Sequence, residues 1–200
     1  MKRVSQLTAL ALLMGLAAST SAAESMPTLT LSTLQQQNGV AIDTRLSAFY
    51  NGWPQSANGP QGHEPQALNL SASWLGAMND EQLSAWAKLH NLQTSTPIAL
   101  YGNADDNAKV AARLQAAGFT HLSSLGDALS QAGRLQKLPH FEQLVYPQWL
   151  HDLQRGEPVT AAPAGEWKVF EAAWGAPKFY LLSHIPGAGR SEERRVGKEC

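Results

Sequence analysis

The sequence predicts an α/β fold, with helices on both faces of a parallel sheet, because short apolar runs alternate with helical patterns along the chain. The runs at 40–43, 98–101 and 120–125 have the length and the apolar content of strands. The segments at 79–92 and 107–117 repeat apolar residues at helical spacing. Strands that alternate with helices in this way are joined by crossovers, which make neighbouring strands parallel.

The other predicted helices carry local signals. A leading helix is predicted over 28–37, where leucines lie among polar residues. The clearest helix covers 79–92, since Asn79 can cap its first turn and Gln82 can return the bond. A short helix is expected at 126–135. The apolar face of the helix at 79–92 is predicted to contain Leu83, Trp86, Leu89 and His90.

The stretch at 97–118 is the centre of the predicted domain. It places a buried strand, a tight loop and a helix in succession, and the helix has Val110, Ala111 and Leu114 on one face. Gly118 stands where a helix commonly ends in a left-handed residue. In a parallel sheet such a loop lies at the carboxyl ends of the strands, where ligands bind. We expect any active site of this domain at this loop.

The loop contains Gly102, Asn103, Asp105 and Asp106, and no Lys or Arg precedes Lys109. Covalent catalysis needs a nucleophile, and the loop offers none. Two carboxylates at a helix N-terminus complement the helix dipole and would repel an anionic substrate. The residues therefore predict a loop satisfied by its own acids, with no catalytic residue.

This stretch resembles the active-site segment of the rhodanese family, in which a buried strand ending in Tyr-Cys leads into a short loop with Gly and Arg and then into a helix. Gly102 stands at the position of the family's cysteine. The resemblance implies a rhodanese-like sheet. For the parent protein it implies transfer of sulfane sulfur from thiosulfate or a persulfide donor, through a cysteine persulfide, to a thiol or other thiophilic acceptor. In the family's exported, multi-domain sulfurtransferases, inactive modules precede an active one.

Other segments carry the same resemblance. Asp43 and Arg45 match a family signature in which an Asp and an Arg hold the loops around the active site. His63 stands at the histidine of a partial match to the family's Gly-His-Ile-Pro-Gly-Ala segment, and His184 begins a complete His-Ile-Pro-Gly-Ala. We expect structural roles for these four residues, and for His63 in particular a role in holding its loop.

The domain organisation follows from these matches. We expect a noncatalytic rhodanese-like domain at 28–137 and a Pro-rich linker with a short helix at 138–165. Because the histidine segment recurs about one domain length later, 167–189 is expected to be the truncated start of a second rhodanese-like domain. The aromatic residues of the linker are expected to pack against a neighbouring domain.

Both ends of the chain are expected to lie outside the fold. Residues 1–23 have the positive start, the apolar run and the small-residue cleavage site of a signal peptide, which predicts export to the periplasm and no membrane span in the mature chain. Residues 190–200 include seven charged side chains and the one cysteine, Cys200. This tail resembles the translation of a sequencing adapter, so we expect it to be an artefact and the chain to be an N-terminal fragment.

Composition excludes little but fits this interpretation. A chain of 200 residues with 44% hydrophobic residues and a net charge of −1 is typical of globular proteins and gives no electrostatic reason to expect nucleic acid as a partner. The six histidines lack metal-ligand spacing, so neither a metal nor a cofactor is expected. Two functions remain open: a noncatalytic part of a sulfurtransferase, or a binding or scaffolding module that uses Asp105 and Asp106 to hold a cationic group.

Overall fold

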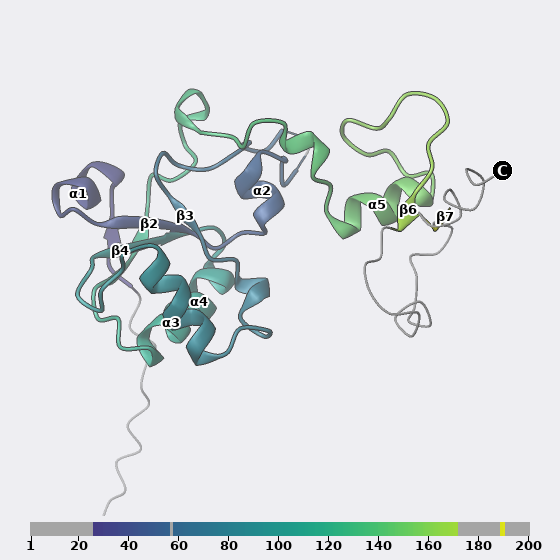
Figure 1. Ribbon diagram of the computed structural model, residues 1–200. Coiled ribbons are helices and arrows are strands. Elements are labelled where there is room, and N and C mark those ends of the chain that lie inside the picture. Colours follow the sequence, from purple (N-terminus) through teal and green to yellow (C-terminus); the bar gives the residue numbers. More distant parts are fainter. Residues whose placement is uncertain (1–25, 57, 172–188, 191–200) are drawn as a thin grey trace, which may run out of the picture. The chain divides into compact units, whose positions relative to one another are not determined.

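The computed structural model describes residues 26–56, 58–171 and 189–190 (Figure 1). Its contacts divide the chain into two compact units. The first unit consists of Met1–Leu46 and Glu64–Arg134, and the second consists of Ser47–His63 and Leu135–Cys200. The second unit therefore takes one segment from the middle of the predicted domain and one from beyond it.

The first unit is built on a five-stranded sheet in the order β1-β5-β4-β2-β3. Every neighbouring pair of strands in it is parallel, which confirms the predicted sheet. Its strands are β1 (Thr28–Leu29), β2 (Val40–Asp43), β3 (Leu68–Asn69), β4 (Ile98–Tyr101) and β5 (Leu122–Leu125). The central strand, β4, is buried along its whole length, as its unbroken apolar run predicts.

Helices cover both faces of this sheet, as expected from the sequence (Figure 1). On one face, α3 (Asp80–Leu89) and α4 (Ala104–Ala116) pack through Leu83, Val110 and Leu114 against the β4 side chains Ile98 and Leu100. On the other face, α1 (Leu31–Gln36) packs its two leucines against Ala99 and Tyr101. Successive β4 side chains alternate between the two cores, which is the period of a strand.

The helix caps follow the sequence closely. Asn79 and Gln82 form the predicted capping box at α3, with bonds of 2.8 and 2.9 Å. The predicted face of α3 is wrong at Leu89, which is 76% exposed, because Leu83 and Ala87 are the α3 residues that the core buries. Gly118 has the expected left-handed conformation, with a φ of 93°.

Two other predictions needed correction. The segment at 28–37 is not helical throughout, because Thr28–Leu29 pairs with β5 as an edge strand before α1 begins. The helix predicted at 126–135 is reduced to a 3-10 turn, η2 (Ala132–Arg134). A second 3-10 turn, η1 (Ala72–Trp74), lies between β3 and α3.

The second unit has an aromatic core of its own. Trp53 and Trp149 are buried, and Phe49, Phe141 and Tyr146 pack around them. The centroid of the Trp53 ring lies 5.6 Å from that of Phe141 and 5.9 Å from that of Trp149. Its elements are α2 (Ser47–Asn51), η3 (Phe141–Gln143), α5 (Pro147–Gln154), β6 (Phe170–Glu171) and β7 (Gly189–Arg190).

The helix expected within 138–165 is confirmed as α5. The aromatic residues of that segment contact Trp53 and Phe49, which come from the insertion at 47–63. The segment thus contributes to a packed unit. The signal peptide predicted at 1–23, most of 167–189 with His184, and 191–200 lie outside the described residues. No helix among the described residues is both long and apolar enough to cross a membrane.

Candidate functional site

The site predicted from the sequence lies at the carboxyl edge of the sheet, where β2 and β4 end side by side. Asp43, the last residue of β2, is in register with Tyr101, the last residue of β4. Both side chains are buried, at 0% and 2% exposure. The sheet therefore brings the Asp43 signature next to the loop that begins at Gly102, as the rhodanese resemblance implies.

The loop between β4 and α4 is very short. Only Gly102 and Asn103 separate Tyr101 from Ala104, the first residue of α4. The Asn103 side chain accepts a bond of 2.8 Å from the Asp106 N–H, which caps the helix. This bond explains why α4 begins three residues before the predicted start at 107. It also occupies one of the N–H groups that a helix N-terminus could offer to an anion.

The two loop carboxylates serve the helix itself. Asp105 and Asp106 lie in the first turn of α4, where negative charge is favourable. The Asp106 carboxylate accepts a bond of 2.6 Å from the Asn103 amide and lies 3.8 Å from the Lys109 amine. The loop is thus satisfied by its own residues, which is the arrangement that the sequence indicated.

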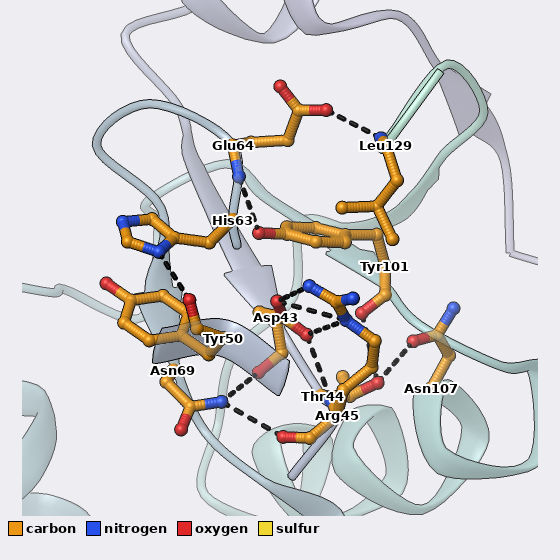
Figure 2. A network of polar contacts seen from close by, with 10 residues as sticks. All are labelled: Asp43, Thr44, Arg45, Tyr50, His63, Glu64, Asn69, Tyr101, Asn107 and Leu129. Carbon is orange, nitrogen blue, oxygen red and sulfur yellow. Dashed lines mark hydrogen bonds and ion pairs between the residues drawn. The ribbon is translucent and has the colours of Figure 1, made fainter. Parts of the chain in front are cut away.

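Gly102 has no room for a side chain. Its φ of 147° is one that other residues rarely adopt. A Cβ atom built there would collide with Thr44 Oγ1. Figure 2 shows why Thr44 cannot easily move away, because its buried hydroxyl lies 2.8 Å from Asn107 Oδ1 and 3.1 Å from the Tyr101 carbonyl oxygen. The space that a side chain at the family's cysteine position would need is therefore occupied by the side chain of Thr44, which follows β2.

Asp43 and Arg45 form a buried ion pair. Arg45 Nη2 lies 2.6 Å from Asp43 Oδ2, and Arg45 Nε donates a second bond to the same carboxylate. The Asn69 amide donates to the backbone carbonyls of both residues, at 2.9 and 3.1 Å. The Arg45 guanidinium also lies 5.9 Å from the centre of the Tyr101 ring. The pair therefore lies where the ends of β2, β3 and β4 meet.

The sequence reasoning missed Tyr101 and Glu64 as parts of this network. The Glu64 N–H donates to the Tyr101 hydroxyl at 3.1 Å, and the Glu64 side chain is fully buried (Figure 2). Burial raises the pKa of the Tyr101 hydroxyl well above its usual range, and the nearby Asp43 carboxylate raises it further. The hydroxyl therefore stays protonated and acts as a hydrogen-bonding group. The signal for Glu64 was an acid in place of the Ile of the family's histidine segment.

His63, in the second unit, is held by its neighbours there. Its ring stacks on that of Tyr50 at 3.8 Å between centroids, and Nδ1 lies 2.7 Å from the Tyr50 carbonyl oxygen. Because a carbonyl only accepts, Nδ1 carries the hydrogen. The His63 backbone pairs with Gln136. These contacts involve both the ring and the backbone of His63.

Among the described residues, no group of three or more His, Cys, Asp or Glu side chains is placed to hold a metal ion. A half-open cavity of about 260 Å³ lies along α3, lined by apolar side chains such as Leu83 and Phe119 and by polar or charged ones such as Asp80 and Lys88. None of the residues that line it belongs to the loop after Tyr101.

Known proteins resemble this chain in sequence and in fold. The chain is 68% identical, over all 200 of its residues, to "Thiosulfate sulfurtransferase YnjE" of Escherichia coli (strain K12). This chain is a relative of that sulfurtransferase. The aligned residues make up 46% of YnjE, so the chain spans about half the length of the curated relative it matches. No protein-family model matches the chain.

Solved structures support the relationship. The crystal structure of YnjE matches with a TM-score of 0.77 and 70% identity, over 86% of this chain and 41% of that one. A structure of EanB, described as holding a cysteine persulfide and ergothioneine, matches with a TM-score of 0.70 and 26% identity, over 80% of this chain and 38% of that one. The match to YnjE and the five parallel strands confirm the rhodanese-like α/β fold that the sequence predicted.

Proposed function

We propose that this chain is the N-terminal part of an exported thiosulfate sulfurtransferase, and that the part described here is a noncatalytic rhodanese-like module. The observation that carries the proposal is the identity of 68% to YnjE over the whole chain. In the proposed reaction, a cysteine thiolate attacks the outer sulfur of thiosulfate, the S–S bond breaks and sulfite leaves. The resulting persulfide then gives its outer sulfur to a thiol or another thiophilic acceptor.

The catalytic cysteine of this reaction would lie in the part of the protein beyond this chain. Here Gly102 occupies the matching position, and Thr44 fills the space that a side chain would need. The loop also has two acids and no cation before Lys109. The two acids repel an anionic donor such as thiosulfate. Because the loop has no cation, it also offers this donor no counter-ion.

Two measurements test this proposal. Reading the gene past the codon for Gly189 should reveal a further module with a Tyr-Cys loop that carries Gly and Arg. The full-length protein should then transfer sulfur from thiosulfate to cyanide, whereas the 200-residue chain alone should give only the background rate. Turnover by the short chain would overturn the noncatalytic assignment. A full-length protein with no such loop and no turnover would favour the alternative, a binding or scaffolding module.

We also propose that the protein acts in the periplasm. The support is the charge order, the apolar run and the cleavage pattern within residues 1–23. The mature protein recovered from a periplasmic fraction should begin at Glu24, and mass spectrometry of its N-terminal peptide checks this. A chain that keeps residues 1–23 and stays in the cytoplasmic fraction would contradict export.

A further inference from the structure

The half-open cavity along α3 belongs to the first unit alone, because every residue that lines it lies within the segment Glu64–Arg134. Figure 1 shows α3 beside α4 on one face of the sheet. One wall of the cavity is a stripe of α3 that includes Leu83, Ser84, Ala87 and Lys88. Residues three and four positions apart lie on the same side of a helix, so the helix itself places these side chains together.

The other wall forms where the chain leaves the two helices. After α3 the Leu92 N–H donates to the Ala87 carbonyl at 2.9 Å, and after α4 the Phe119 N–H donates to the Leu114 carbonyl at 3.0 Å. Each is the longer bond of a Schellman motif, which turns the chain back at a helix end and brings an apolar side chain into contact with the helix. Leu92 and Phe119 are buried accordingly, at 8% and 5% exposure. Backbone hydrogen bonds thus hold this wall in place without a ligand.

The size of the cavity fits a molecule with one ring. Small residues leave the space, since Ala87 and Ala117 contribute only a methyl group each to the lining. The volume is about 260 Å³. An apolar cavity of about 150 Å³ can hold benzene, whereas sites for drug-sized molecules measure roughly 300–1,000 Å³. A single aromatic ring with a small substituent lies between these limits.

The charges around the cavity favour an uncharged molecule. Asp80 is paired with Arg113, whose Nη1 lies 2.5 Å from the carboxylate. Lys88 lies in the last turn of α3, where it balances the negative end of the helix dipole. A bound anion would approach the C-terminal ends of two helices, and a bound cation would approach Lys88. A neutral hydroxyl meets neither, and the hydroxyl groups of Ser84 and Thr94 can bond to it.

We propose that this cavity is a binding site for a small, uncharged aromatic molecule of the phenol class. The ring packs against the apolar side chains of Leu83, Leu92 and Phe119, and the hydroxyl bonds to the polar side chains that line the same cavity. Removal of the ring from water drives the binding, because most of the lining is apolar. This inference does not depend on the proposed sulfurtransferase activity.

Methyl NMR of the full-length protein during titration with para-cresol tests the proposal. The methyl resonances of Leu83 and Leu92 should shift with a dissociation constant on the order of 1 mM. Those of Leu31 and Leu34, which pack on the other face of the sheet, should stay unchanged. Equal shifts in all four leucines, or none at Leu83 and Leu92, would show that the cavity is not a binding site.

Two charged probes test the chemical class of the ligand. Para-toluate and para-methylbenzylamine share the ring and the methyl group of para-cresol, but one is an anion and the other a cation. Each should bind at least about threefold more weakly than para-cresol, because its charge loses hydration beside an apolar surface. Binding of either probe as tight as that of para-cresol would overturn the assignment to an uncharged ligand.

Ala117→Leu and Ser84→Leu test the location of the site. Both positions line the cavity and are exposed, so a larger side chain can occupy part of the volume without disturbing the core. Each variant should weaken para-cresol binding about tenfold. Ala116→Leu is the matched control, because Ala116 is also exposed, is adjacent to Ala117 and does not line the cavity. It should bind as the wild type does. Wild-type affinity in both cavity variants would place the ligand elsewhere and overturn the proposal.

Discussion

At the scale of single residues, the space beside Gly102 can hold only one side chain, and that of Thr44 occupies it. We predict that Gly102→Cys destabilises the first unit by about 2–6 kcal/mol, because a positive φ and an overpacked core each cost about 1–3 kcal/mol. Thr44→Ala removes the hydroxyl in the way, so the double variant should lose less stability than the sum of the two single variants. Exchange of the β4 amides reports the stability of this unit.

Gly76→Ala is the control for this pair, since a Cβ there meets nothing within 4 Å. It should leave the β4 exchange within about 0.5 kcal/mol of the wild type. If the Gly102 and Thr44 variants were additive, the two side chains would not compete for the same space. A cysteine at position 102 should also fail to transfer sulfur, since the loop still lacks a cation.

Tyr101 makes a prediction about pH. An unfolded tyrosine loses its proton near pH 10, whereas burial and Asp43 raise the pKa of Tyr101 in the folded chain. Above about pH 10 the unfolded state therefore binds fewer protons than the native state, and stability falls as pH rises. Urea unfolding between pH 8 and pH 11 should show this fall in the wild type and a smaller one in Tyr101→Phe. Parallel losses in the two proteins would show that Tyr101 does not contribute.

At the scale of elements, the two helices on one face of the sheet begin in the same way. Asn79 accepts a bond of 2.8 Å from the Gln82 N–H, and Asn103 accepts one of 2.8 Å from the Asp106 N–H. We predict that Asn79→Ala and Asn103→Ala each cost about 1 kcal/mol, and that the corresponding Asp variants recover most of it. Unfolding in urea measures both. A much larger loss at Asn103 alone would mean that its loop does more than cap α4.

Elements with a local cause were predicted well from the sequence. The apolar runs of β2 and β4 match the structure residue by residue, and the capping box of α3 needs only Asn79 and Gln82. Elements that depend on a partner distant in the sequence were not predicted. Thr28–Leu29 is a strand because β5 lies beside it, and no pattern within two residues can show that.

The candidate site could likewise be predicted from the sequence only where its features have a local cause. The absence of a nucleophile at Gly102 could be read directly from the sequence, and so could the acids that follow it. The obstruction by Thr44 could not, because residues 44 and 102 meet only when β2 and β4 pair. The same holds for Glu64, whose partners Leu129 and Arg134 are 65 and 70 residues away. A charged residue in place of an apolar one was the only local sign.

At the scale of the whole molecule, the two units have cores of their own, on the two faces of the sheet in the first and around Trp53 in the second. Separate cores allow separate unfolding, since each unit opens with a free energy set by its own contacts. The aromatic core is assembled from 47–63 and from the segment after Arg134, so both should respond together when it is disrupted. Disrupting the aromatic core therefore tests whether the two units unfold separately.

Trp149→Ala is the variant that makes this test. Trp149 is 8% exposed, its ring lies tilted against that of Trp53, and it donates a bond of 2.8 Å to the Thr160 carbonyl. Its loss should cost about 3–5 kcal/mol within the second unit, so amides at 47–56 and 135–160 should exchange much faster while β4 is unaffected. Trp74→Ala, at a tryptophan that is 38% exposed in the first unit, should leave the second unit unchanged. If Trp149→Ala accelerated β4 exchange equally, the aromatic core and the cores on the sheet would unfold as one.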